Sequence, residues 1–176
     1  MSPSHPVVQF EGQLIDRSGG IPNLRAPSSR ELMEKVLAWT EFIEFVTGWD
    51  RVEHGTLTLD HVRPLPLVAL GDVAHLGVEP EGIFDNFNPG YGVLMRQRGI
   101  RKFYGAVARA GEFEHVAVVS QQEFPARQDR LEVYSNVRLR DVLGIKTDDG
   151  VSVDVYHSND WTEFASGSLW RSNDES

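Results

Sequence analysis

The sequence predicts a mainly β protein with one long helix, whose strands close into a small barrel. Short apolar or alternating segments, separated by glycine and proline, recur along most of the chain, as is typical of many short strands. Only one segment repeats its apolar residues at helical intervals over several turns. Short strands in such number tend to close into a barrel. A chain of 176 residues with 40 % hydrophobic content is enough for one compact domain and its core.

The first strand and the helix come at the start of this pattern. Residues 7–15 favour a strand, and residues 28–47 favour the helix. Ser28 with Glu31 three positions later has the spacing of a capping box, and Gly48 is a typical stop. The apolar stripe of this helix consists of Leu32, Val36, Trp39, Ile43 and Val46.

The rest of the chain is rich in short strands. They are expected at residues 55–60, 65–70, 102–109, 114–120, 131–135 and 151–155. Pro64 and Pro66 place the second of these at a sheet edge, because proline lacks the N–H group that a central strand needs. The third and fourth form a hairpin across Ala110-Gly111. Residues 139–143 are expected to form one helical turn, which Gly144 closes.

Composition narrows the classes of function. A formal net charge of -9 argues against a general binder of nucleic-acid backbones, which needs a basic surface. The absence of cysteine excludes disulfides, thiolate zinc sites and cysteine nucleophiles. No apolar run approaches the roughly 20 residues of a membrane helix, and the start lacks the features of a signal peptide. We therefore expect a cytoplasmic protein without membrane contact, with one domain over residues 7–170 and frayed tails at 1–6 and 171–176.

Two threonines in the strand at 55–60 are candidate metal ligands. Thr56 and Thr58 are two residues apart, so in a strand their side chains point the same way. Two hydroxyl oxygens on one face can hold Mg²⁺ with phosphate oxygens completing the shell. The alternative is that threonine is simply favoured in strands. His54 and His61 are seven positions apart, so they are expected on opposite faces and not in a shared metal site.

The segment 131–140 carries a second set of candidate residues. Glu132 lies in the expected strand between apolar residues, and Arg138 and Arg140 follow at the start of the expected helical turn. Amides at a helix start bind phosphate, and arginine side chains strengthen that binding. The alternative is a set of solvated charges at the rim of a barrel.

In their order along the chain, these motifs resemble the archaeal-type CTP-dependent riboflavin kinases. The shared features are a strand ending in a glycine turn, an amphipathic helix, a Gly-Thr-Leu strand, a glutamate-bearing strand leading to Leu-Arg, and a late Asp-Gly strand. The resemblance covers residues 8–156 and is strongest at Gly55-Thr56-Leu57 and at Leu139-Arg140 with Asp149-Gly150, whereas residues 71–100 match poorly. It implies a single-domain, six-stranded cradle-loop barrel that transfers a phosphoryl group from CTP to riboflavin and gives FMN.

The resemblance also implies a role for individual residues. Thr56 and Thr58 would hold Mg²⁺, although the family has asparagine where Thr58 stands, and Glu132 would contact the flavin. Ser135-Asn136 replaces the family's Ala-Pro pair after the glutamate strand. The residues expected to bind the nucleotide are Arg17, Ser18, Gly19, Gly20, Ile21, Val137, Arg138, Leu139 and Arg140.

Three functions from different classes follow from this pattern. The first is nucleotide-dependent phosphoryl transfer to riboflavin, with CTP as donor and Mg²⁺ as cofactor. The second is a non-catalytic module that binds a flavin or a nucleotide, because Thr58 replaces asparagine and the loop at 17–21 has fewer glycines than the family's. The third is an interaction protein whose acidic surface meets a basic partner through residues 71–100. The first two require that the threonine strand and the arginine segment converge on one pocket.

Overall fold

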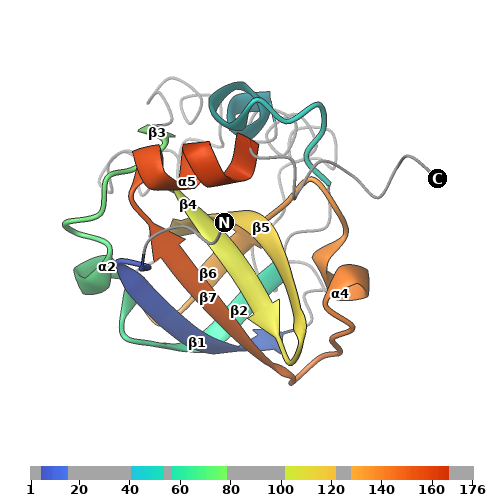
Figure 1. Cartoon of the computed structure of the whole chain (residues 1–176). Helices are drawn as coiled ribbons and strands as arrows, with labels where there is room; N and C mark the ends of the chain where they lie inside the picture. The colour runs from blue at the N-terminus through green and yellow to red at the C-terminus, as the bar shows by residue number, and fades with distance from the viewer. Residues whose placement is uncertain (1–4, 16–40, 54–56, 79–101, 122–127, 167–176) are drawn as a thin grey trace, which may run out of the picture.

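The described part of the chain forms a closed barrel of six antiparallel strands (Figure 1). The computed structural model describes residues 5–15, 41–53, 57–78, 102–121 and 128–166. The barrel strands are β1 (Val8–Ile15), β2 (Leu57–Arg63), β4 (Lys102–Ala110), β5 (Phe113–Gln121), β6 (Leu131–Tyr134) and β7 (Gly150–Tyr156). Their order is β4-β5-β6-β2-β1-β7, and pairing between β4 and β7 closes the ring. The predicted barrel is therefore confirmed.

The predicted hairpin and the predicted helical turn are also present. β4 and β5 pair from Phe103 opposite Ser120 to Ala110 opposite Phe113, around a turn at Gly111 and Glu112. Gly111 has a φ of +59°, a conformation that glycine adopts without steric cost. The turn after β6 is α4 (Leu139–Val142), and it ends before Gly144, whose φ is +64°. A short additional strand, β3 (Gly77–Val78), pairs with the beginning of β4.

The prediction of an edge strand at 65–70 is wrong. This segment forms a short helix, α2 (Pro66–Ala69), and the amides of Ala69 and Leu70 donate to the carbonyls of Leu65 and Pro66. Pro66 stands in the first turn, where its fixed φ suits the helix and its missing N–H group would have had no partner. Pro66, which favours a sheet edge in the sequence, is therefore a helix-start residue, and Pro64 precedes the helix.

Two further helical segments flank the barrel. Residues 41–47 are helical, and the chain leaves the helix at Gly48 with a φ of +75°. The rest of the helix expected at 28–47 lies outside the described residues. The C-terminal helix α5 (Ser158–Ser166) was not predicted from the sequence. Within the described residues, none of the helices combines the length and the apolar character that crossing a bilayer requires.

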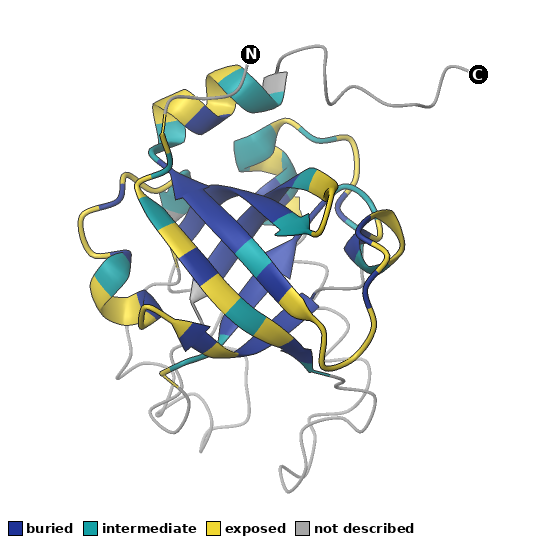
Figure 2. Ribbon diagram, turned by 60° about the horizontal axis from the view of Figure 1, so that its bottom comes forward, coloured by how far each residue is buried: buried dark blue, intermediate teal, exposed yellow. Residues whose placement is uncertain are grey.

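The barrel wall separates two hydrophobic clusters. The interior cluster fills the barrel with alternate residues of every barrel strand. The outer cluster lies on the other face of the wall and consists of Ile43, Val52, Phe103, Val107, Val116, Val118, Tyr134, Tyr156 and Trp161. The helical segment 41–47 and α5 cover this outer face. Trp49, two residues after the helical segment, contacts Trp161 of α5 at 5.8 Å between ring centroids. Figure 2 shows the resulting run of buried residues along the strands.

A close approach between β4 and α5 holds the outer cluster together. Trp161 is fully buried, and its indole N–H donates to the carbonyl of Ala106 at 2.9 Å. The ring lies directly on Gly105, where a Cβ atom would come within 2.6 Å of the Trp161 Cβ and closer still to the ring. Glycine at this position is therefore required for α5 to pack on the barrel.

Candidate functional site

A row of buried polar side chains crosses three neighbouring strands. Thr58 on β2 stands opposite Glu132 on β6, and Glu132 stands opposite Ser120 on β5. Directly opposed residues point to the same face of a sheet, so these three side chains, which we call the polar row, lie side by side. Their neighbours along β2 and β6 belong to the interior cluster. The polar row therefore lies on the outer face of the barrel wall.

The polar row is almost closed to solvent. Each of its three residues is at most 5 % exposed. Among the residues that the structure describes, the Ser120 hydroxyl has no hydrogen-bond partner. A buried hydroxyl without a partner costs about 1–3 kcal/mol and is uncommon in native proteins. Ser120 is consequently a candidate for contact with a ligand, and the sequence analysis did not identify it.

Tyr134 connects the polar row to the outer cluster. Its hydroxyl donates to Glu132 Oε2 at 2.7 Å. Its ring packs edge-on against Phe103, with 6.1 Å between the ring centroids. Because Glu132 and Tyr134 are two residues apart on β6, both face outward. Glu132 thus belongs to the polar row and is joined by Tyr134 to the outer cluster.

The structure brings together part of the predicted site. Thr58 and Glu132, which are far apart along the chain, are direct neighbours in the β2–β6 ladder. On the other side of residues 54–56, the Glu53 amide donates to the carbonyl of Ser135 at 2.9 Å. The chain before and after residues 54–56 therefore runs alongside residues 133–135. Thr56 itself and the predicted nucleotide loop at 17–21 lie outside the described residues.

The predicted arginine segment lies at one end of the barrel. Leu139 is buried in the interior cluster and Val137 packs against that cluster, so their side chains face the core. Arg138 is exposed, and its Nε lies 3.6 Å from a carboxylate oxygen of Asp141. Among the described residues, neither Arg138 nor Arg140 forms a hydrogen bond or ion pair with the polar row.

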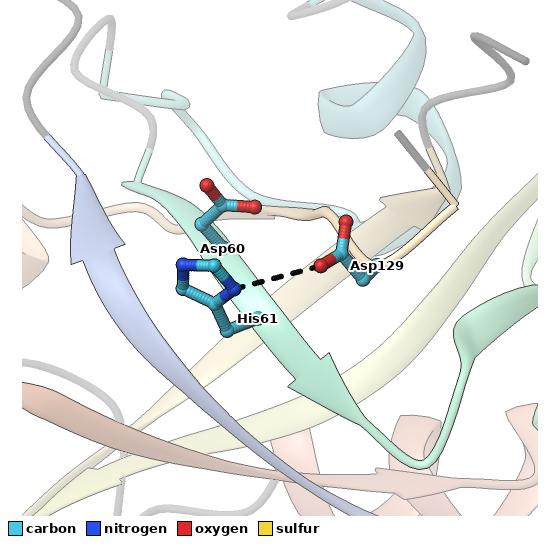
Figure 3. A group of neighbouring side chains, drawn as sticks. All are labelled: Asp60, His61 and Asp129. Atoms are coloured by element: carbon cyan, nitrogen blue, oxygen red, sulfur yellow. Dashed lines mark ion pairs between the residues drawn. The ribbon is translucent and has the colours of Figure 1, made fainter. Parts of the chain in front are cut away.

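A bulge in β2 changes the direction of two side chains beyond Thr58. The β1–β2 register passes from Gln13 opposite Asp60 to Glu11 opposite Arg63, so β2 gains a residue. His61 takes a φ of +54° within this irregular stretch. Bulges redirect side chains that would otherwise alternate between faces, and both Asp60 and His61 come near Asp129 as a result (Figure 3).

Asp60, His61 and Asp129 form a compact group of possible metal ligands. One ligand atom from each lies within 4.8 Å of the others, and His61 Nδ1 is 3.7 Å from Asp129 Oδ2 (Figure 3). Imidazole and carboxylate groups are common ligands of divalent transition metals. The Arg130 guanidinium lies 3.6 Å from Asp60 Oδ1, and its positive charge opposes cation binding at that oxygen. Sequence spacing excluded a site shared by His54 and His61, but it gave no sign of this group.

The Ser135-Asn136 pair is tied to β5. The Ser135 hydroxyl donates to the Val116 carbonyl at 2.8 Å, and Asn136 Oδ1 lies 3.0 Å from His115 Nε2. Burial lowers the pKa of His115 below its usual value, and the hydrogen bond to Asn136 opposes this effect only in part. His115 is therefore held mainly as the neutral imidazole near pH 7.

This lowered pKa predicts a pH-dependent stability. Between the folded and unfolded pKa values of His115, the unfolded chain binds more protons, so the free energy of unfolding falls as pH decreases below about 6.5. Urea unfolding of the wild type and of His115→Gln from pH 7.5 to 5 measures this effect. The variant is expected to lose part of the dependence, and equal slopes for the two proteins would contradict the prediction.

Comparisons with known proteins identify no family to which this site could be assigned. A scan against protein-family models finds no match, and a search of curated proteins finds no significant match. The polar row and its neighbours are therefore the basis for any functional proposal.

Proposed function

We propose that this chain is a cytoplasmic transferase that moves a phosphoryl group from a nucleoside triphosphate, CTP, to a hydroxyl of riboflavin. The observation that carries the proposal is the pairing of Thr58 with Glu132, both buried on the outer face of one ladder. The two residues expected to serve the metal and the flavin are thus neighbours. We also propose that this barrel has the cradle loops of the family that the sequence resembles, and that its long helix covers residues 28–47.

The residues present fit a magnesium ion in their chemistry. The Thr58 hydroxyl is a hard oxygen donor, and the Glu132 carboxylate places negative charge across the ladder from it. Thr56 would be the second hydroxyl ligand. When bound, Mg²⁺ neutralises charge on the phosphate oxygens of the nucleotide.

The chain's own groups would mainly position the substrates. Glu132 accepts a hydrogen bond from the flavin or from the riboflavin hydroxyl that reacts. This hydrogen bond fixes the orientation of the reacting hydroxyl. The loop at 17–21 and the segment 137–140 hold the nucleotide. In that segment Arg138 and Arg140 supply positive charge, whereas Val137 and Leu139 face the core and support its backbone. Phosphoryl transfer requires little more from a protein than positioning and charge neutralisation.

One observation favours a non-catalytic module as the second candidate. Thr58 is only 3 % exposed, whereas Mg²⁺ gives up its water shell reluctantly and needs access to its ligands. A protein of this kind would bind the flavin or the nucleotide without turning it over. The two candidates share the site and differ in whether FMN forms.

The test is a reaction with riboflavin, Mg²⁺ and each nucleoside triphosphate in turn, with FMN measured by chromatography. FMN formation that is lost in Thr56→Ala supports the transferase. Binding of riboflavin or nucleotide by calorimetry without FMN supports the module. The absence of binding to either compound would overturn both.

Thr58→Asn provides a prediction specific to the metal. An asparagine carbonyl is a better ligand for Mg²⁺ than a hydroxyl, so we expect nucleotide binding to need about tenfold less Mg²⁺, which corresponds to about 1.4 kcal/mol. Calorimetric titrations of nucleotide at several Mg²⁺ concentrations measure the change. Thr162→Asn, at an exposed position of α5, is the matched control and is expected to behave as the wild type. Equal Mg²⁺ dependence in Thr58→Asn and wild type would contradict the prediction.

A further inference from the structure

The hydrogen bond between Tyr134 and Glu132 defines how that carboxylate is held. The distance from the tyrosine hydroxyl to Oε2 is 2.7 Å, and both side chains are at most 5 % exposed. A hydroxyl that donates to a carboxylate in a buried setting forms a strong, charge-assisted bond. A carboxylate has about four acceptor positions, so this bond leaves Glu132 able to accept others.

The position of the Tyr134 hydroxyl is itself set by packing. Its ring lies edge-on to Phe103 at 6.1 Å, and Phe103 in turn contacts Phe42 of the helical segment 41–47 at 5.4 Å. Tyr134 also stands opposite Val118 in the β5–β6 ladder. These contacts restrict rotation of the ring, so the hydroxyl and the Glu132 carboxylate that it binds keep a fixed orientation.

We propose that Tyr134 is a positioning residue, which orients the Glu132 carboxylate toward a hydrogen-bond donor of the ligand. This inference rests on the proposed function, in which Glu132 contacts riboflavin. A donor on the ligand, either a ribityl hydroxyl or the imide N–H of the ring, meets a carboxylate whose direction Tyr134 has already set. The ligand does not have to order that side chain when it binds.

The experiment is a double-mutant cycle on riboflavin affinity. Tyr134→Phe keeps the ring and its packing and removes only the donor. We expect it to bind riboflavin about tenfold more weakly than the wild type. In the Glu132→Gln background the same change should cost much less affinity, because the charged acceptor that Tyr134 orients toward the ligand is no longer present. Riboflavin binding is measured by fluorescence quenching, and urea unfolding checks that each variant is folded.

Tyr156→Phe is the matched control. Tyr156 is a buried tyrosine of the same outer cluster, on β7 rather than β6. Its change to phenylalanine is expected to leave riboflavin affinity unaltered. If Tyr134→Phe fails to fold, Phe103→Leu takes its place, because it keeps the hydroxyl and loosens the ring; it should weaken binding about threefold.

The outcomes separate this inference from the function on which it rests. Wild-type binding with equal affinity in Tyr134→Phe overturns the positioning role and leaves the proposed function intact. A loss in Tyr134→Phe that is equally large in the Glu132→Gln background also overturns it, because Tyr134 would then act independently of Glu132. A wild-type protein that does not bind riboflavin overturns the proposed function and this inference together.

Discussion

Replacing Gly105 with alanine is expected to destabilise the protein by about 3–5 kcal/mol, the range measured when a large buried aromatic loses its packing. The added methyl group would overlap the Trp161 ring, which lies directly on Gly105. Relief requires that the indole moves, which breaks its hydrogen bond to the Ala106 carbonyl and opens the outer cluster. Urea unfolding followed by tryptophan fluorescence measures the loss.

A second glycine provides the control. Gly150 begins β7, and a Cβ atom there would meet nothing within 4 Å. Gly150→Ala is therefore expected to change the free energy of unfolding by no more than about 0.5 kcal/mol. Similar unfolding midpoints for Gly105→Ala and Gly150→Ala would show that α5 does not pack on β4 as described.

Replacing Glu132 with glutamine is expected to lower riboflavin affinity about 10- to 100-fold. Hydrogen bonds to charged groups contribute about 1.5–3 kcal/mol, and this carboxylate lies in the middle of the polar row. Glutamine has nearly the same shape, and its carbonyl oxygen can still accept from the Tyr134 hydroxyl. The loss should therefore appear in binding and in FMN formation, with little change in the urea midpoint.

The matched control for this change is Glu112→Gln. Glu112 lies exposed in the turn between β4 and β5, away from the polar row. The Glu112→Gln substitution removes the same charge as Glu132→Gln, so it tests whether the net charge alone alters riboflavin binding. Equal losses in Glu112→Gln and Glu132→Gln, or none in either, would remove Glu132 from the proposed site.

The barrel strands could be predicted because their signals are local. β1 and β7 alternate between apolar and polar residues, and the β4–β5 hairpin has a glycine at its turn. The helix α5 was missed because its apolar stripe is short: Trp161, Phe164 and Ala165 are the residues with which it packs on the outer cluster. A stripe that covers little more than one turn does not repeat often enough for an amphipathic helix to be recognised.

The site depends on register, which local sequence does not reveal. Thr58 and Glu132 could be proposed separately, but their direct opposition follows from the pairing of β2 with β6. The irregularity in β2 that brings Asp60 and His61 near Asp129 interrupts the regular alternation of a strand, which local sequence does not show. Tyr134 lies within the strand expected at 131–135, but only the structure shows that its hydroxyl donates to Glu132.

The closure of the ring has a consequence for how the chain is made. β7 pairs with β1, which begins at Val8, and also with β4. During synthesis β1 therefore lacks one of its two neighbouring strands until β7, which ends at Tyr156, has left the ribosome. Until then the nascent polypeptide has an open sheet with an uncovered apolar lining, the kind of surface that chaperones bind. Pairings so distant along the chain also make folding slow, so the barrel should close only after β7 has been synthesised.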